Sequence, residues 1–515
     1  MNHLLAVPII LPAVMAALLL ILHRAPIAAA RVVSVGATGC LLGVAFAIFA
    51  QAGPSAPLVY ALGNWPAPFG IVLVADRLSA LMLTLTALLG LVVALYAAQG
   101  WDAKGRFFHP LFLFQLMGLN GAFLTGDLFN LFVFFEVLLI ASYCLTLQGL
   151  GRERLRATLH YAALNIAASS VFLIAVSLLY GVTGTLNMAH LAERIARVPA
   201  EDIALVRAAG LLLLGVFGVK AALFPLHFWL PAAYSSAPAP VAALFSIMTK
   251  IGIYAIIRLK TLVYGIDAGA VMDLTTPWLL PCALVTLSFA TIGAFGADRL
   301  AIMAAYLTMA STGTILSTVA LGGAAALSAA LYYLAHSTVV IAVLFLSADL
   351  IGRSRGDMGD ALHPGPQIRH AGWLGLAFLF GGATVAGLPP LSGFLGKVLV
   401  LQSTQEGSAA APMWTVVLVT SVLTLIACTR AGSIVLWNVT EPLPGRPAHP
   451  LRRGELIAFT ILVACSLMLV VFAAPLLRYF DETAADLISP TPYIDAVLGS
   501  SRDGVIKPYA GVSGD

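Results

Sequence analysis

Long apolar stretches alternate with short polar connections along almost the whole chain. An α-helix needs about 20 mostly apolar residues to cross the hydrocarbon core of a bilayer, and these stretches reach that length. Apolar and polar positions do not alternate residue by residue, so a transmembrane β-barrel is not expected. The pattern predicts an all-α polytopic membrane protein with about fourteen spans, near residues 4–22, 32–50, 78–98, 107–124, 128–147, 159–180, 204–230, 237–260, 277–296, 300–321, 324–350, 372–402, 411–437 and 456–480.

The polar connections carry some structure of their own. Residues 58–76 are rich in Pro, Gly and aromatic side chains, which predicts a short hairpin on one face of the membrane. Residues 185–203 predict an amphipathic helix at the membrane interface. The longest connections cover 51–77, 185–203, 351–371 and 438–455, and a polar tail follows Phe480.

The composition agrees with a membrane protein and excludes other classes. Hydrophobic residues make up 60% of the 515 residues and charged residues 10%, whereas a soluble domain carries about 25% charged residues. The mean hydropathy of +0.98 excludes an intrinsically disordered chain, which is poor in apolar residues. The net charge of +4 comes from scattered basic residues, so no basic face for nucleic acid is expected.

The remaining general signals concern orientation and cofactors. Lysine and arginine are more frequent in connections that follow odd-numbered spans, which predicts that both termini face outward from the cell membrane. The first apolar run lacks a basic flank and is too long for a signal peptide, so it predicts a retained span. The five cysteines lie in apolar runs without metal-ligand spacing, and no nucleotide or nucleophile motif is present. We therefore expect no metal, no cofactor and no enzyme in the ordinary sense.

Ionisable residues inside the predicted spans are the most informative positions. A charged side chain at the bilayer centre costs about 2.5–3.5 kcal/mol on insertion scales, and such residues are usually functional. Snorkelling to the interface can explain a single lysine, but a glutamate stem is too short for it. Five such residues lie inside the spans, namely Glu136, Lys220, Lys250, His336 and Lys397.

A set of purely structural ion pairs would require an acid for each lysine, and only Glu136 is a deep acid. Burial disfavours the charged form of a lysine, and a nearby carboxylate favours it. We therefore expect these lysines to bind and release protons, with Glu136 and Lys220 forming a switchable ion pair. In the second half of the chain a hydroxyl face takes the place of a second acid, at Thr308, Ser311, Thr312 and Thr314.

Helix-breaking residues accompany two of the lysines. Pro225 and the supporting polar residue His227 follow the lysine of span seven. Pro389 and Pro390 precede the lysine of span twelve. Proline removes a backbone donor and clashes with the preceding turn, so both helices are expected to break. Paired broken spans in two halves of a transporter mark its ion site, because their freed backbone groups line a hydrated cavity.

The broken span is the fourth of five in two successive groups of spans, which predicts two five-helix repeats. No repeat is visible in the letters of the sequence, so this expectation depends on position alone. We expect four parts: 1–106 with spans one to three, 107–262 with the first repeat, 263–437 with the second repeat, and 438–515 with the last span and a polar tail.

Three strings around these residues are long and specific, namely GLNGAFLTGDLFNLFVFFEVLLIASY at 118–143, KAALFPLHFWLPAAYSSAPAPVAALFSIMTKIGIYAI at 220–256 and GLPPLSGFLGK at 387–397. Over spans three to thirteen the chain resembles the D subunit of Mrp-type cation/proton antiporters, also called Pha- or Mnh-type. The wider superfamily contains the antiporter-like, proton-pumping subunits of respiratory complex I. The tail at 481–515 is too short and too polar for the lateral helix of the distal complex I subunit.

The resemblance implies fourteen helices in two inverted five-helix repeats with broken spans seven and twelve. It also implies functional roles for Glu136, for the paired lysines Lys220 and Lys250, for the terminal lysine Lys397 and for His336 on a central hydrophilic axis. It further implies a complex with A-, B-, C-, E-, F- and G-like membrane subunits. Such a complex exchanges Na⁺ or K⁺ for H⁺ across a bacterial inner membrane without a redox cofactor.

Two other functions stay open at the level of the sequence. A proton-pumping subunit of a complex I-like or membrane-hydrogenase complex would carry the same charged residues, and the neighbouring genes would separate it from an antiporter. A structural membrane subunit would use its charges only to hold helices together. Charge-neutral substitutions that preserve assembly but abolish transport would exclude that possibility. No motif in the sequence distinguishes Na⁺ from K⁺.

Overall fold

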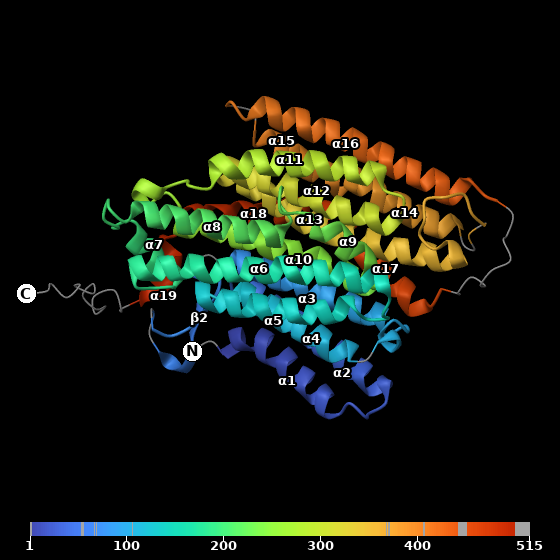
Figure 1. Ribbon diagram of the computed structural model, residues 1–515, viewed down its shortest axis with the longest axis horizontal. Coiled ribbons are helices and arrows are strands. Elements are labelled where there is room, and N and C mark those ends of the chain that lie inside the picture. The colour runs from blue at the N-terminus through green and yellow to red at the C-terminus, as the bar shows by residue number, and fades with distance from the viewer. Residues whose placement is uncertain are drawn as a thin grey trace, which may run out of the picture.

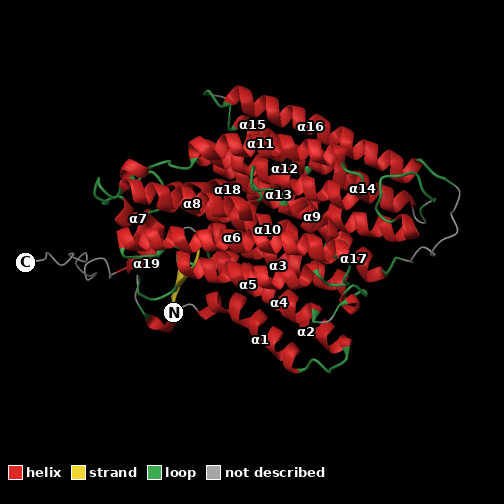
Figure 2. Ribbon diagram, in the orientation of Figure 1, coloured by secondary structure: helices red, strands yellow, loops and turns green. Residues whose placement is uncertain are grey.

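The computed structural model describes residues 3–52, 56–65, 67, 69–105, 107–366, 368, 371–404, 407–440 and 451–499. Over these residues the chain is almost entirely helical, with one two-stranded sheet (Figure 2). Twelve helices in the described ranges are long and apolar enough to cross a membrane, and three shorter apolar helices accompany them. The prediction of a helical, multi-span membrane protein is confirmed.

The N-terminal helices lie at one edge of the bundle (Figure 1). After a short 3-10 turn, α1 (Val7–Ile21) and α2 (Ile27–Gln51) form this edge. An antiparallel hairpin of β1 (Leu58–Ala61) and β2 (Val72–Ala75) leads into α3 (Arg77–Ala97). The hairpin expected within residues 58–76 is therefore present.

The remaining helices follow in chain order. The first group is α4 (Phe108–Leu124), α5 (Leu128–Thr146), α6 (Arg152–Thr183), α7 (Met188–Ile195), α8 (Ile203–Ala221), α9 (Trp229–Ser236) and α10 (Ala239–Arg258). The second group is α11 (Thr276–Gly296), α12 (Leu300–Leu321), α13 (Ala324–Ser354), α14 (Ala371–Ala386), α15 (Ser392–Gln402) and α16 (Ala410–Gly432). The chain then continues with α17 (Arg453–Val471), α18 (Ala473–Ile488) and α19 (Thr491–Leu498).

Two helices form the centre of the bundle. The apolar windows of α10 and α13 are 100% and 94% buried inside the chain, whereas those of α1, α2, α16 and α17 are only 28–33% buried. Helix α10 continues into a π-helical turn at Leu259–Val263, so it extends further than its α-helical bounds. The chain proceeds from α1 and α2 at one edge to α15 and α16 at the opposite edge, and α1 begins at the end of the bundle where α19 lies (Figure 1).

Two interruptions lie where the prolines predict them. The chain leaves the helix over residues 222–228, between α8 and α9, and over residues 387–391, between α14 and α15. Pro225 lies in the first gap, and Pro389 and Pro390 lie in the second. A backbone amide freed at the first gap, that of Phe224, donates to the hydroxyl of Thr286 at 2.8 Å. Side chains of neighbouring helices therefore satisfy part of the exposed backbone.

The end of the chain differs from its prediction. The sequence predicts one span over residues 456–480, but a turn at Phe472 separates α17 from α18. The polar tail expected after Phe480 is helical over its first part, because α18 continues beyond Phe480 and α19 follows. Residues 500–515 of that tail lie outside the described residues.

The second half of α18 is not recognised from the sequence because only one face of the helix is apolar. Phe480, Ala484 and Leu487 are buried on that face. The Phe480 ring packs edge-on against Tyr332 of α13, with ring centroids 6.1 Å apart. Packing of this face on the core stabilises a helix whose sequence contains many polar residues.

The amphipathic helix expected at residues 185–203 is shorter than predicted. It is present as the eight-residue helix α7. Its apolar side chains are buried within the chain, where α7 contacts α19 and the π-helical turn after α10. The apolar face of α7 therefore packs against the rest of the protein.

Candidate functional site

Glu136 and Lys220, the expected switchable ion pair, lie close together and are linked through a hydroxyl group. Glu136 is on α5 and Lys220 is near the end of α8, and both are among the described residues. The hydroxyl of Ser169, on α6, donates to Oε1 of Glu136. Lys220 Nζ donates to the same hydroxyl at 3.4 Å. Ser169 therefore links the carboxylate to the ammonium group.

The surroundings of Lys220 are otherwise apolar. The residue is 5% exposed, and its Nζ lies 5.7 Å from the centroid of the Phe135 ring. Phe172 and Phe217 pack edge-on against each other beside that ring. The position of Lys220 near the end of α8 puts it next to the first helix interruption.

Lys250 is fully buried at the centre of the bundle. It lies on α10, and its Nζ donates to the hydroxyl of Ser311, on α12, at 2.9 Å. A second, longer contact of 3.4 Å joins Nζ to the hydroxyl of Thr249. Ser311 belongs to the hydroxyl face that the sequence predicts for the second half of the chain, and it donates onward to the carbonyl of Thr308 at 2.7 Å. Neutral oxygens therefore surround this lysine.

His336 lies on α13 and reaches the second helix interruption. It is fully buried, and its Nδ1 is 2.9 Å from the hydroxyl of Ser392, the first residue of α15. Among the described residues, no hydrogen-bond partner is found for its Nε2. A Cβ atom at Gly393 would lie 1.8 Å from the carbonyl oxygen of Thr384, on α14, and 3.1 Å from the imidazole Cε1, so the absence of a side chain there allows α15 to approach both α14 and the histidine.

Lys397 lies on α15, directly after the second interruption, and is half-buried. Its Nζ donates to the carbonyl of Ala386, the last residue of α14, at 2.8 Å. It also donates to the hydroxyl of Ser421, on α16, at 2.9 Å. The broken helix thus supplies a carbonyl oxygen to the lysine, as expected for an interruption that serves an ion site.

His227 lies in the first interruption but does not join these contacts. It is 1% exposed, and its ring packs against those of Phe224, Phe228 and Phe289. Within the described part of the chain neither ring nitrogen has a hydrogen-bond partner. Its contacts are those of a histidine in an aromatic pocket, and none of them reaches a lysine.

The structure therefore arranges the predicted residues in a row across the bundle. The helices that carry them pack on one another in sequence: α6 lies against α5 and α8, α10 against α8 and α13, and α15 against α13 and α16. Sequence analysis does not identify two linking residues, Ser169 and Ser421. A serine in a span is an ordinary residue, and the only available signal is its place on a helix next to one that carries a charge.

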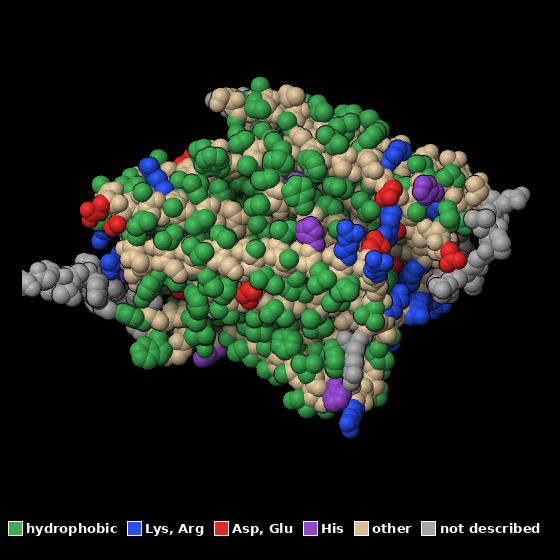
Figure 3. All heavy atoms as spheres, in the orientation of Figure 1, with side chains coloured by type: hydrophobic (Ala, Val, Ile, Leu, Met, Phe, Trp, Pro, Cys, Tyr) green, Lys and Arg blue, Asp and Glu red, His purple; other side chains and the backbone are tan. Residues whose placement is uncertain are grey.

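A large cavity opens at one end of the bundle. Its volume is about 690 Å³, and its lining includes Arg154, Tyr234, Ala242, Asp349 and Arg353. The hydroxyl of Tyr234 is buried and has no partner among the described residues. Figure 3 shows charged side chains mainly at the two ends of the visible face, with the larger group at one end and few charged side chains between them. Four arginines line the cavity, at positions 152, 154, 299 and 353, together with four acids, at positions 153, 349, 357 and 360.

No group of three or more His, Cys, Asp or Glu side chains that could hold a metal ion is found among the described residues. The row consists of one carboxylate, three lysines, one histidine and several hydroxyls. These groups can bind and transfer protons.

Comparison with known proteins shows the family. The family described as NADH:quinone oxidoreductase/Mrp antiporter, TM, matches residues 125–426, which contain all five predicted ionisable residues. The chain belongs to this family. A relative from Rhizobium meliloti, named as the D subunit of a probable K(+)/H(+) antiporter, is 39% identical over 98% of this chain and 99% of its own length. The D subunit of the Na(+)/H(+) antiporter from Bacillus subtilis is 36% identical over 97% of this chain and 100% of its own length.

A solved structure of the same family agrees with the fold. It is a chain of the Mrp complex from a Dietzia species, with 30% sequence identity and a TM-score of 0.84. The match covers 97% of this chain and 100% of the other. The resemblance expected from the three motif strings is therefore confirmed over nearly the whole length.

Proposed function

We propose that the chain is the D-type member of a multisubunit cation/proton antiporter, which exchanges Na⁺ or K⁺ for H⁺ across a bacterial inner membrane. It is a component of a secondary transporter and not an enzyme. The observation that carries this proposal is the row of ionisable side chains from Glu136 to Lys397, each within hydrogen-bond distance of a serine hydroxyl, with two interrupted helices beside the lysines. The names of the full-length relatives support it.

Protons move along this row from one ionisable group to the next. Glu136 exchanges a proton with Lys220 through the Ser169 hydroxyl, which both groups contact. Lys250 and His336 lie on the two most buried helices and continue the row. Lys397 is the exchange point at one end of the path, because it is only half-buried and lies at the second interruption. Water fills the distances between these groups.

The finer architecture is fourteen spans with two inverted five-helix repeats. The short helix α4 and the interrupted pair α14 and α15 add two spans to the twelve long ones. Each group of five contains one interrupted span with a lysine beside the interruption, Lys220 before the first and Lys397 after the second. The repeats occupy 107–262 and 263–437, between an N-terminal part at 1–106 and a C-terminal part at 438–515.

The orientation follows from the distribution of arginine. The cavity of about 690 Å³ lies at the arginine-rich end, which the positive-inside rule assigns to the cytoplasm. Both termini then face outward. The cavity gives water access to α10 near Ala242, two helical turns from Lys250 on the same face of the helix. The protein contacts A-, B-, C-, E-, F- and G-like subunits within the bilayer.

The family also includes membrane subunits of quinone oxidoreductases, so a proton-pumping subunit of a complex I-like or membrane-hydrogenase enzyme is the second candidate. Neighbouring genes for small E-, F- and G-like subunits favour the antiporter, and quinone or hydrogenase modules favour the second candidate.

The decisive experiment measures proton flux in everted vesicles from cells that express the complete operon. Addition of Na⁺ or K⁺ is expected to dissipate an imposed pH gradient in vesicles with the complete complex. Vesicles from cells that lack this subunit are the control. Cation-independent behaviour of both preparations would contradict the proposal.

A further inference from the structure

A small pocket lies between the hydroxyl partner of Lys250 and the lysine of the second interruption. Its volume is about 10 Å³, which is the room that one water molecule needs. Its polar lining comes from four helices, with Ser311 and Thr314 of α12, Tyr333 of α13, Lys397 of α15, and Thr420 and Thr424 of α16. Ser311 is also the residue whose hydroxyl accepts from Lys250 Nζ at 2.9 Å. The pocket therefore connects the contacts of one lysine to the other lysine.

The tyrosine differs from the other hydroxyls of this pocket. About one turn earlier in their own helices lie the carbonyl groups that accept from Ser311, Thr314, Thr420 and Thr424. The hydroxyl of a tyrosine stands at the far end of a rigid ring, so it does not bond back to its own turn in this way. Tyr333 is buried, and its hydroxyl is hydrogen-bonded to that of Thr314. Tyr333 can therefore accept a hydrogen bond from one group of the pocket and donate to the next.

His336 lies beside Tyr333, but its hydrogen bonds lead in another direction. The two rings meet edge-on, with centroids 5.2 Å apart. The Nδ1 atom of His336 is 2.9 Å from the Ser392 hydroxyl, which in turn lies 3.3 Å from the hydroxyl of Ser466, on α17. The contacts of His336 thus continue towards α17, whereas those of Tyr333 continue towards α12 and the Lys250 partner.

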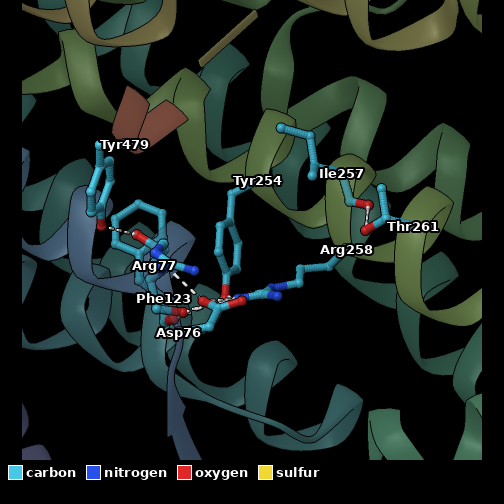
Figure 4. A network of polar contacts seen from close by, with 9 residues as sticks. Asp76, Arg77, Phe123, Tyr254, Ile257, Arg258, Thr261 and Tyr479 are labelled. Atoms are coloured by element: carbon cyan, nitrogen blue, oxygen red, sulfur yellow. Dashed lines mark hydrogen bonds and ion pairs between the residues drawn. The ribbon is translucent and has the colours of Figure 1, made fainter. Parts of the chain in front are cut away.

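Another tyrosine, Tyr254, lies one turn beyond Lys250 on α10, but its hydroxyl is held by other groups (Figure 4). It accepts from Arg258 Nε at 3.2 Å, lies 3.2 Å from the Ser79 hydroxyl, and donates to the carbonyl of Phe123 at 2.8 Å. The ion pairs around it are those of Arg258 with Asp76, and of Arg77 with Glu482 and Asp486 of α18. Tyr254 therefore belongs to a network of ion pairs, and none of its contacts reaches Lys397.

We propose that Tyr333 is a further residue of the transport path, whose hydroxyl, together with one water molecule in the pocket, passes protons between Ser311 and Lys397. In each transfer the ammonium group of Lys250 loses one proton and the neutral amine of Lys397 gains one. Every hydroxyl and the water accept one proton and give up another, so they end unchanged. This link lies beside His336 and gives the row a second connection. The inference rests on the proposed function, because it takes both lysines as members of the path.

The test compares two neighbouring tyrosines of α13 in everted vesicles with the complete complex. A Cβ atom at Gly396 would lie 3.0 Å from Cδ2 of Tyr333 and 3.4 Å from Cδ1 of Tyr332, so both rings pack against α15. The Tyr332 hydroxyl, however, donates to the carbonyl of Leu469, on α17, at 3.1 Å. Tyr333→Phe is expected to lower cation-driven exchange about tenfold at normal membrane abundance, less than the loss of a positioned acid or base, because the connection through His336 remains. Tyr332→Phe is the matched control and is expected to keep near-normal exchange.

A second variant separates a proton link from an effect on packing. Thr314→Val removes the hydroxyl that contacts Tyr333 and keeps the shape of the side chain, so it also tests the link if Tyr333→Phe does not reach the membrane. Two hydroxyls of one link make the double variant Tyr333→Phe/Thr314→Val no slower than the slower single variant, whereas independent effects on packing multiply. Multiplied decreases, or normal exchange by either single variant, would overturn the link. A lack of cation-driven exchange by the wild type would instead contradict the proposed function.

Discussion

At the scale of single residues, the three lysines of the row share an unusual environment. Each bonds to neutral oxygens, with Ser169 on the first, Ser311 on the second and Ser421 on the third. A carboxylate in direct contact would hold the proton on a lysine, whereas a hydroxyl accepts from the charged form and can donate to the neutral form. Such an environment suits a lysine that changes its protonation state during transport.

The first prediction concerns the hydroxyl link between α5 and α8. Ser169→Ala removes the contact shared by Glu136 and Lys220, so exchange is expected to fall on the order of 10²-fold, the lower end of what a positioned acid–base group contributes. Glu136→Gln is expected to stop exchange without loss of the protein from the membrane. The matched control is Ser170→Ala, because this serine is exposed and its hydroxyl donates to the carbonyl of Ile166 in its own helix.

The measurement is antiport in everted vesicles together with the abundance of the protein in the membrane. Near-normal exchange by Glu136→Gln would remove this carboxylate from the path.

The second prediction concerns Lys397. Arginine remains charged throughout the working pH range, so Lys397→Arg is expected to lose most of the antiport activity although the charge is conserved. Lys397→Ala is expected to be at least as inactive. An anchoring lysine would behave differently, because arginine snorkels as well as lysine does. Arg430→Lys serves as control, since Arg430 bonds to the backbone carbonyls of Phe295 and Ala297 and lies outside the row.

The pH profile of antiport decides the question for Lys397→Arg at normal assembly levels. An unchanged rate and profile would show that Lys397 is an anchor.

At the scale of helices, the two interruptions supply backbone carbonyl groups that are free to accept hydrogen bonds, which an unbroken helix does not offer. The carbonyl of Ala386 is free to accept from Lys397 because α14 ends there. Sequence analysis finds these positions because proline and glycine mark breaks by local chemistry. It cannot find which oxygen each lysine contacts, because Ser169 and Ser421 lie on other helices than their lysines, and only helix packing brings each pair together. For the same reason, the sequence predicts a tail in place of the second half of α18, whose apolar face is recognisable only against α13.

The third prediction tests the second interruption. Replacement of Pro389 and Pro390 by alanine allows the helix to continue, so the carbonyl of Ala386 would be taken up by the backbone. Exchange is expected to fall several-fold more than membrane abundance. Pro281→Ala is the control, because Pro281 lies inside α11, which continues through it. Equal decreases in exchange and in abundance would indicate a loss of packing only.

At the scale of the whole molecule, the peripheral pair α1 and α2 is attached to the bundle by few polar contacts. Arg31, on α2, donates to both carboxylate oxygens of Asp102, at 2.6 and 2.8 Å, in the loop before α4. His109 contacts the same carboxylate at 3.1 Å. On α1, the carbonyl of Pro8 accepts a hydrogen bond from the side-chain amide of Asn120, on α4, at 2.8 Å.

The fourth prediction concerns the stability supplied by Asp102. Burial opposes its ionisation, but hydrogen bonds from His109 and Arg31 outweigh burial and lower the pKa of the carboxyl from 3.8 to about 2. The carboxylate therefore stabilises the folded state fully above about pH 4, and this contribution is lost as the pH falls through about 2. Asp102→Asn is expected to lower the thermal unfolding temperature in detergent by several degrees at pH 7.

The difference between Asp102→Asn and the wild type should shrink progressively below pH 4. Asp267→Asn, at an exposed loop position, is the control and should leave the unfolding temperature unchanged. An equal unfolding temperature for Asp102→Asn and the wild type at pH 7 would show that this contact does not stabilise the fold.

The pairing of Arg77 with α18 has a consequence for the order in which the chain is made. Its partners Glu482 and Asp486 lie 405 and 409 positions further along the sequence. At 5–20 residues per second, a ribosome needs roughly 20–80 s to reach them after Arg77 has emerged. During that time Arg77, at the start of α3, is without the carboxylates of α18. The partner of Arg258, in contrast, is Asp76, which is synthesised 182 residues earlier and is already present when α10 emerges. The Arg258–Asp76 pair can therefore form during synthesis, whereas the contacts of Arg77 form only when α18 packs against the bundle.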